Sequence, residues 1–146
     1  MPNFTPDLKG KTPKDILLKE VMYNSPATFN ESTDIFSAME KLIDFNLSGA
    51  PVIDKSGQLK GWLSEKDCLK FVLEAKYYNN PPESIGQFMS KNVVSLQASD
   101  SLFHAIDLFT RYHFQCYPIT ENDVVVGVVS RSQVLKAVGK IAQTTW

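Results

Sequence analysis

The sequence contains one pattern twice, and this internal repeat limits the folds that a chain of 146 residues can adopt. The stretch GWLSEKD at 61–67 returns as GVVSRSQ at 127–133, which is 66 positions later. Upstream of this motif the spacing is 67, as for Pro51 and Pro118, so one residue is missing from the second copy. A long period that occurs twice indicates two copies of one supersecondary unit rather than a solenoid.

Each copy predicts the element order β-α-β-β-α. In the first copy an extended stretch, PATF, precedes a helix that we expect to start at Ser32 or Thr33. An apolar strand, APVID, then a turn and a second strand, LKGWLS, predict a hairpin, and the helix EKDCLKFVLEA follows. The second copy has VVSL, a helix from Leu102, YPIT, VVVGVVS and RSQVLKAVGKI in the same order. The apolar stripe expected on the first helix consists of Ile35, Met39, Leu42 and Ile43.

The segment ahead of each copy has its own signals. TPKDILLKEVM predicts a helix capped by Thr12, with Pro13 at the first helical position and Asp15 completing a capping box. IGQFM at 85–89 is its weaker counterpart before the second copy. We therefore expect a short helix to lead into each repeat.

The predicted fold class is α/β (α+β), with two β-α-β-β-α repeats packed about a pseudo-two-fold axis. Each copy alone would bury a marginal core, and its nearly continuous apolar strands imply that both faces of the sheet are covered. Packing the copies together would leave two related clefts, where ligand sites commonly lie. The predicted parts are an N-terminal arm (1–11), the first repeat (12–76), a linker (77–84), the second repeat (85–142) and a C-terminal tail (143–146).

Composition excludes several classes of protein. Fifteen basic residues balance sixteen acidic ones, and no basic tract is long enough to form a nucleic-acid footprint. The longest apolar run, VVVGVV, is far short of the roughly 20 residues that a membrane span needs. The N-terminal MPNFTPDLKGK has no apolar signal-peptide core, so we expect a cytoplasmic protein without membrane attachment.

Catalytic and metal-binding motifs are not found in the sequence, which predicts a protein that is not an enzyme. There is no phosphate-binding loop, no dinucleotide fingerprint and no nucleophile elbow. His104 and His113 do not have the spacing of metal ligands on one helical turn, so we expect no metal site. Cys68 and Cys116 are expected to be reduced, buried thiols. The phenylalanines are expected in the core: Phe36, Phe103, Phe109 and Phe114.

The repeated motif has two interpretations, which its spacing leaves open. Ser64 with Asp67, and Ser130 with Gln133, have the spacing of capping boxes at the start of a helix. The same helix start offers free N–H groups and a positive dipole end that suit a phosphate. An acid in the first turn, such as Asp67, is also suited to accept hydrogen bonds from both hydroxyls of a ribose.

Two copies of this unit, with APVID followed by GWLSEKD, resemble a cystathionine-β-synthase (CBS) domain pair, or Bateman module, over residues 12–142. The resemblance implies a regulatory module that binds an adenosine-containing ligand, such as AMP, ADP, ATP or S-adenosylmethionine. No cofactor would be required, and Mg²⁺ would be bound only with a polyphosphate. The resemblance also implies a homodimer of modules that acts on a separate, unknown protein partner.

The resemblance also implies site residues. In the first site Ser64 would contact phosphate and Asp67 the ribose, while Trp62 would stack on the adenine or fill the cleft. A second site is expected to be weaker, because Gln133 replaces the acid and the residues before Pro118 are bulkier. Trp62 and Gln133 also favour an alternative, a structural or dimerisation module that binds no ligand. The first set is Thr28, Ser48, Gly49, Ala50, Pro51, Trp62, Ser64, Lys66 and Asp67. The second set is Ser95, Gln115, Cys116, Tyr117, Pro118, Ser130, Arg131 and Gln133.

Overall fold

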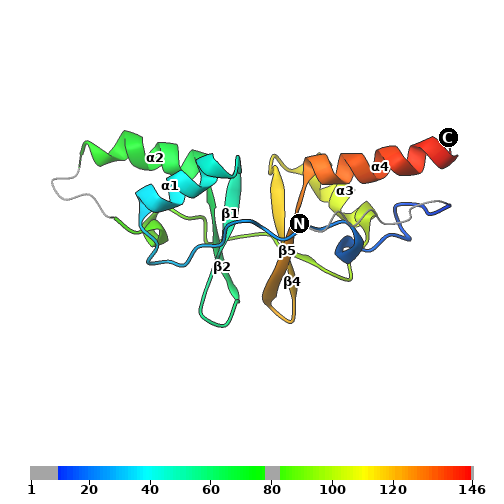
Figure 1. Ribbon diagram of the computed structural model, residues 1–146, viewed down its shortest axis with the longest axis horizontal. Helices are drawn as coiled ribbons and strands as arrows, with labels where there is room; N and C mark the ends of the chain where they lie inside the picture. The colour runs from blue at the N-terminus through cyan, green and yellow to red at the C-terminus, as the bar shows by residue number, and fades with distance from the viewer. Residues whose placement is uncertain (1–9, 78–82, 146) are drawn as a thin grey trace. The chain divides into compact units, whose positions relative to one another are not determined.

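The computed structural model describes residues 10–77 and 83–145, and within them the chain has four α-helices and two small sheets (Figure 1). The elements follow the predicted order, so the α/β class with a repeated β-α-β-β-α unit is confirmed. The first repeat contributes α1 (Ile35–Asp44), β1 (Gly49–Ile53), β2 (Leu59–Ser64) and α2 (Glu65–Ala75). The second contributes β3 (Leu96–Gln97), α3 (Leu102–Arg111), β4 (Cys116–Glu121), β5 (Val124–Ser130) and α4 (Arg131–Thr145).

Parts of the predicted organisation lie outside these ranges. Almost all of the predicted N-terminal arm, most of the predicted linker and the last residue of the tail are not among the described residues. Within the described ranges, no helix has the length and apolar character needed to span a bilayer.

The chain divides into two compact units, and each unit combines parts from both halves of the sequence. The first-repeat unit comprises residues 25–93 and 123–125. The described part of the second-repeat unit comprises residues 10–24, 94–122 and 126–145. Each unit therefore contains most of one repeat together with the segment that leads into the other repeat.

The first-repeat unit is built on the antiparallel β1–β2 hairpin, in which Gly49 lies opposite Ser64. The predicted strand PATF is reduced to one parallel bridge between Phe29 and Val52. Figure 1 shows α1 and α2 beside this hairpin. The buried core of the unit consists of Ala27, Phe29, Ile35, Ala38, Leu42, Ala50, Val52, Leu63, Cys68, Phe71, Ile85 and Met89.

The second-repeat unit repeats this arrangement in a sheet with the strand order β3-β4-β5. Strand β3 runs parallel to β4, with Leu96 opposite Ile119. These two positions correspond to Phe29 and Val52 of the first repeat, so the sequence repeat preserves the strand register. The buried core consists of Ile16, Leu18, Leu96, Ala98, Leu102, Ala105, Tyr117, Ile119, Val129, Val134, Ala137 and Ile141.

The two leading segments pair with their units in equivalent ways. The first segment contains a short 3-10 helix, η1 (Leu18–Glu20), and the second contains η2 (Ile85–Gln87). Each segment has one backbone bridge just before this turn and another just after it. The bridges before the turns are Leu17–Ser101 and Ser84–Asp34, and those after them are Tyr23–Val128 and Ser90–Trp62.

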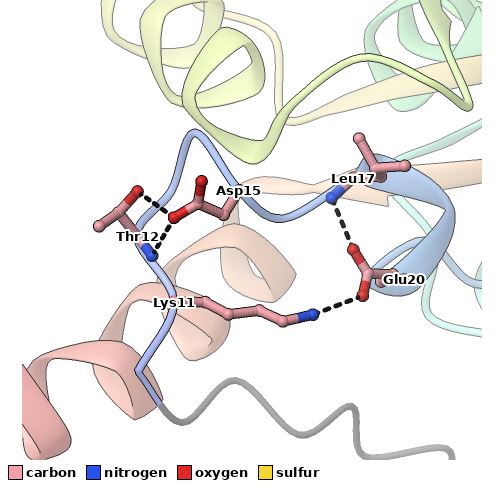
Figure 2. A network of polar contacts seen from close by, with 5 residues as sticks. All are labelled: Lys11, Thr12, Asp15, Leu17 and Glu20. Carbon is pink, nitrogen blue, oxygen red and sulfur yellow. Dashed lines mark hydrogen bonds and ion pairs between the residues drawn. The ribbon is translucent and has the colours of Figure 1, made fainter.

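The prediction of a regular helix from Thr12 is wrong. The Asp15 carboxylate does accept bonds from the Thr12 N–H and hydroxyl, at 3.1 and 2.8 Å, but the turn stops there (Figure 2). Ile16 and Leu18 are fully buried, and Leu18 N–H donates to the Asp100 carbonyl at 2.8 Å. Burial and pairing with another part of the chain use the backbone groups that a helix would need.

A second short network fixes η1. The Glu20 carboxylate accepts a bond from the Leu17 N–H at 2.7 Å, and Lys11 Nζ lies 3.2 Å from its other oxygen (Figure 2). The Leu17 hydrogen bond lowers the pKa of Glu20, and the interaction with Lys11 lowers it further. This network holds the segment in place just before Tyr23.

The first helix starts later than predicted. Its N-cap is Asp34, whose carboxylate accepts a bond from the Ser37 N–H at 3.0 Å. Ser32 and Thr33 cannot serve as caps, because their side chains bond to Asn30 in the preceding turn. The expected apolar stripe is only partly buried, since Ile43 is 76% exposed.

Three of the four phenylalanines are not core residues, which corrects the prediction. Phe36, Phe103 and Phe114 are 61%, 49% and 51% exposed. Phe109 does pack against the second-repeat core, with its ring 4.7 Å from that of Tyr117. The helices therefore carry apolar side chains on outer faces as well as on the faces that cover each sheet.

Candidate functional site

The candidate first site is built around the junction of β2 and α2. Ser64 ends the strand and caps the helix: its Oγ accepts a bond from the Asp67 N–H at 3.1 Å. Asp67 Oδ2 accepts a bond from the Ser64 N–H at 2.9 Å, which completes the predicted capping box. The bond between the two residues fixes the carboxylate at the tip of the helix.

The capping box leaves polar groups available at this tip. Asp67 Oδ1 accepts no hydrogen bond, and the Ser64 hydroxyl finds no acceptor, within the described residues. The Glu65 N–H is used, because it donates to the Ser48 carbonyl at 2.9 Å. Lys66 is exposed and forms no ion pair in the described part of the chain. One carboxylate oxygen, one hydroxyl and one cation are therefore free to meet a ligand.

Strand β1 supplies the other side of the candidate site. A Cβ at Gly49 would overlap Nε1 of Trp62, and it would also lie 2.8 Å from the Leu63 carbonyl. The Trp62 side chain therefore leans along the hairpin and lies against the backbone of Gly49. Ala50 and Pro51 are fully buried, so neither presents its side chain at the surface of the site.

Thr28 is exposed and directly precedes Phe29, whose N–H donates to the Pro51 carbonyl at 3.0 Å. The fold thus brings the predicted residues of the first set to one end of a single hairpin. Lys66 is exposed in the first turn of α2, between Ser64 and Asp67 in the sequence.

The corresponding junction of β5 and α4 has a weaker cap. Ser130 Oγ accepts a bond from the Gln133 N–H at 3.2 Å, and no return bond from the Gln133 side chain occurs among the described residues. The Arg131 N–H donates to the Gln115 carbonyl at 3.0 Å, as Glu65 does to Ser48. Ser95, Gln115 and Arg131 are exposed, whereas Pro118 is buried.

Tyr117 belongs to the core rather than to a ligand surface. Its side chain is 1% exposed, and its hydroxyl donates to the Leu108 carbonyl at 3.3 Å. The rings of Phe109 and Phe114 lie 4.7 and 5.7 Å from its ring. With the whole residue 1% exposed, Tyr117 offers almost no surface to a ligand.

The protein-family model of the CBS domain matches twice, over residues 18–74 and 85–140. The chain belongs to the CBS domain family. Both matched ranges contain the strand, turn and helix junction described above, so each junction is a feature of one CBS repeat.

Known proteins similar to this CBS pair include enzymes and a CBS-pair protein, CBSX2 of Arabidopsis thaliana. The A-adding tRNA nucleotidyltransferase of Aquifex aeolicus is 31% identical over 131 residues, which cover 90% of this chain but 15% of the enzyme. The chain spans less than half the length of the curated relatives it matches.

Two of the solved structures that are similar to this chain are CBS proteins with adenosine compounds bound. CBSX2 in complex with AMP has a TM-score of 0.75 and 23% identity, with 86% of this chain and 97% of that chain covered. The CBS domain pair of protein MJ0100, in complex with 5-methylthioadenosine and S-adenosyl-L-methionine, has a TM-score of 0.73 and 23% identity. The match covers 85% of this chain and 96% of that one. At this identity both likenesses establish the fold.

Sequence reasoning missed two residues beside the helix tips of this CBS pair. Ser90 and Trp62 exchange both backbone hydrogen bonds at 2.9 Å. Tyr23 and Val128 do the same, at 2.9 and 3.0 Å. Both missed residues come from leading segments, and the 67-residue spacing between Tyr23 and Ser90 was the signal that could have found them.

The described residues contain no cluster of three or more histidine, cysteine or acidic side chains that could hold a metal ion. His104 and His113 are both exposed. Cys68 is a buried free thiol and Cys116 a partly buried one. Burial raises the pKa of Cys68 to about 11, and that of Cys116 to about 12.

Both thiols are therefore expected to react slowly with alkylating reagents while the protein is folded. At pH 8 a shift in pKa from 9 to about 11 lowers the thiolate fraction of Cys68 by about 100-fold. Mass spectrometry after a timed exposure to iodoacetamide, in buffer and in guanidinium chloride, measures the difference. Rapid labelling of either cysteine in buffer would contradict the burial described here.

Proposed function

We propose that this CBS pair is a regulatory module that binds an adenosine-containing ligand and acts on a separate partner. The candidate ligands are AMP, ADP, ATP and S-adenosylmethionine. The observation that carries the proposal is the tip of α2, where Ser64 and Asp67 cap the helix, yet the Ser64 hydroxyl proton has no acceptor and Asp67 Oδ1 accepts no bond among the described residues. The complexes of two similar CBS proteins with adenosine compounds support the ligand class.

The chemistry of these groups fits a nucleoside with a phosphate. A carboxylate accepts hydrogen bonds from the two hydroxyls of a ribose, and charge makes each of these bonds stronger. A helix N-terminus with a nearby hydroxyl and an exposed Lys66 favours a phosphate. The small residues Gly49 and Ala50 let a base approach the backbone closely.

One observation favours the alternative, a structural or dimerisation module that binds nothing. The Trp62 side chain lies against Gly49, where the base would approach the strand. If the indole stays there, it blocks the site; if it turns, it can stack on the adenine. Trp62 therefore reports on the choice between the two functions.

Calorimetric titration of the full chain with AMP, ATP and S-adenosylmethionine tests the proposal. At least one of the three is expected to bind with a dissociation constant below 1 mM, which corresponds to about −4 kcal/mol. The fluorescence of Trp62, isolated by the change Trp146→Phe, is expected to respond to the same ligand. Adding Mg²⁺ is expected to change the measured affinity only for ATP. If no adenosine ligand binds in this range, the alternative of a structural module stands.

We also propose that two copies of the module associate and that a separate protein reads the ligand state. The exposed apolar residues of α2 support this, since Leu69, Val72 and Leu73 are 69%, 57% and 64% exposed. Contiguous apolar surface on a helix commonly marks a protein interface. The net charge of −1 argues against nucleic acid as the partner, and the reduced thiols fit a cytoplasmic setting.

A further inference from the structure

The two CBS repeats place an aromatic side chain beside the helix tip from opposite strands of the same backbone pair. In the first-repeat unit the pair is Trp62 with Ser90, and in the second-repeat unit it is Val128 with Tyr23. Val128 stands at the position of Trp62, and Tyr23 stands at the position of Ser90. The large residue is thus on the hairpin strand in one unit and on the leading segment in the other.

Both aromatic side chains reach toward equivalent neighbours. The Trp62 indole lies against Gly49, whose counterpart in the second repeat is Cys116. Because Tyr23 pairs with Val128, its side chain lies on the same face of the pair as that of Ser130, two residues further along β5, and Cys116 and Ser130 are neighbours of its phenol. Ser130 is the cap of α4 and the counterpart of Ser64.

Trp62 and Tyr23 differ in their effect on the serine that caps the adjacent helix. The hydroxyl of Ser64 has no partner other than the Asp67 N–H among the described residues, so it is free to donate to a ligand. Ser130, which accepts from the Gln133 N–H, has the Tyr23 phenol as a neighbour on the same face of the strand pair. Burial raises the pKa of Tyr23 to about 12 and Cys116 adds to the rise, so the phenol keeps its proton at neutral pH.

We propose that Tyr23 closes the second repeat to an adenosine ligand, because its phenol lies beside Ser130 and Cys116 at the tip of α4 and fills the space that the ligand would need. This inference rests on the proposed function and deepens it: the chain binds one ligand, in the first repeat. Gln133 also contributes, because this position lacks the carboxylate that Asp67 provides in the first repeat. Restoring an acid at position 133 does not open the site while Tyr23 remains. The position that sets the stoichiometry therefore lies outside the repeated motif.

The test compares the number of AMP molecules bound per chain, by calorimetry, in matched variants. Wild type and Gln133→Asp are both expected to bind one. Tyr23→Ser with Gln133→Asp is expected to bind two, because it copies Ser90 and Asp67 into the second repeat. A Gln133→Asp variant that binds two would overturn the role of Tyr23.

A further variant protects the test against loss of packing. Tyr23→Ser combined with Val128→Trp, Cys116→Gly and Gln133→Asp transfers the aromatic side chain to the strand that carries it in the first repeat, with glycine at 116 leaving room for the indole as Gly49 does. This variant is also expected to bind two AMP molecules, and circular dichroism checks its folding. If the folded variants gain no second site, the inference is wrong.

These experiments distinguish failure of the inference about Tyr23 from failure of the proposed function. If wild type binds no AMP but the variants with Tyr23 removed bind one molecule, Tyr23 does close the second repeat and the first site is wrongly assigned. If wild type binds one molecule and the folded variants also bind one, the proposed function stands and the inference about Tyr23 falls.

Discussion

Replacing Asp67 with alanine is expected to weaken binding of the adenosine ligand by about 10- to 100-fold, the effect of losing charged hydrogen bonds worth about 1.5–3 kcal/mol. The substitution removes Oδ1, which is unpaired among the described residues, and also Oδ2, which accepts from the Ser64 N–H at 2.9 Å. Loss of the cap alone would lower the free energy of unfolding by about 1 kcal/mol. Calorimetric titration and thermal unfolding of the same variant measure the two effects separately.

Two control variants separate the cap from the ligand contact. Asp67→Asn retains an oxygen that can accept from the Ser64 N–H but lacks the charge, so stability should change little while affinity still falls. Gln133→Ala, at the equivalent position of the second repeat, should leave affinity unchanged because its side chain makes no bond to the cap in the described residues. Wild-type affinity in Asp67→Ala would remove this residue from the site.

Local signals predicted the elements around the site accurately. The capping box of Ser64 and Asp67 is present, and the turn residues Gly57, Asn122 and Asp123 have the positive φ angles that their chemistry favours. These features depend on interactions within four or five residues. A pattern of that length contains the information needed to specify them.

Contacts between distant segments were not predictable in the same way. The sequence around Thr12 and Asp15 does form the hydrogen bonds of a capping box, yet tertiary pairing of Ile16 and Leu18 prevents a helix. Tyr23 and Ser90 were missed because each lies in a leading segment that pairs with the other repeat. Their role depends on the pairing of each leading segment with the other repeat, which no local sequence pattern predicts.

The exposed phenylalanines show a second limit of sequence patterns. A helix with apolar residues on two faces gives the same periodicity whether the second face covers a core or a partner. Phe36 packs its ring 5.6 Å from that of Phe71 but remains 61% exposed, so it lies at the edge of the core. The pattern correctly predicted the helix and could not tell which apolar face would be covered.

The exchange of leading segments also explains why glycine recurs in the motif. A Cβ at Gly61 would lie 2.7 Å from the carbonyl of Ser90 and 2.8 Å from the sulfur of Met89. At Gly127 the equivalent contacts are the carbonyl of Tyr23 and the sulfur of Met22, both at 3.0 Å. In both repeats the absence of a side chain lets the leading segment lie directly against the hairpin.

Gly61→Ala is therefore expected to lower the free energy of unfolding by about 3 kcal/mol, the upper end for overpacking, since a backbone carbonyl cannot move aside as a flexible side chain can. For a domain of this size the melting temperature should fall by roughly 6–12 °C. Gly127→Ala should lower the free energy of unfolding by less, about 1–2 kcal/mol, because its contacts are longer.

Gly139→Ala is the matched control: a Cβ there meets nothing within 4 Å, so the change should stabilise α4 by about 0.5–1 kcal/mol. Denaturant unfolding of the three variants measures these differences, and a Gly61→Ala protein as stable as wild type would show that Met89 and Ser90 do not pack against the hairpin in solution.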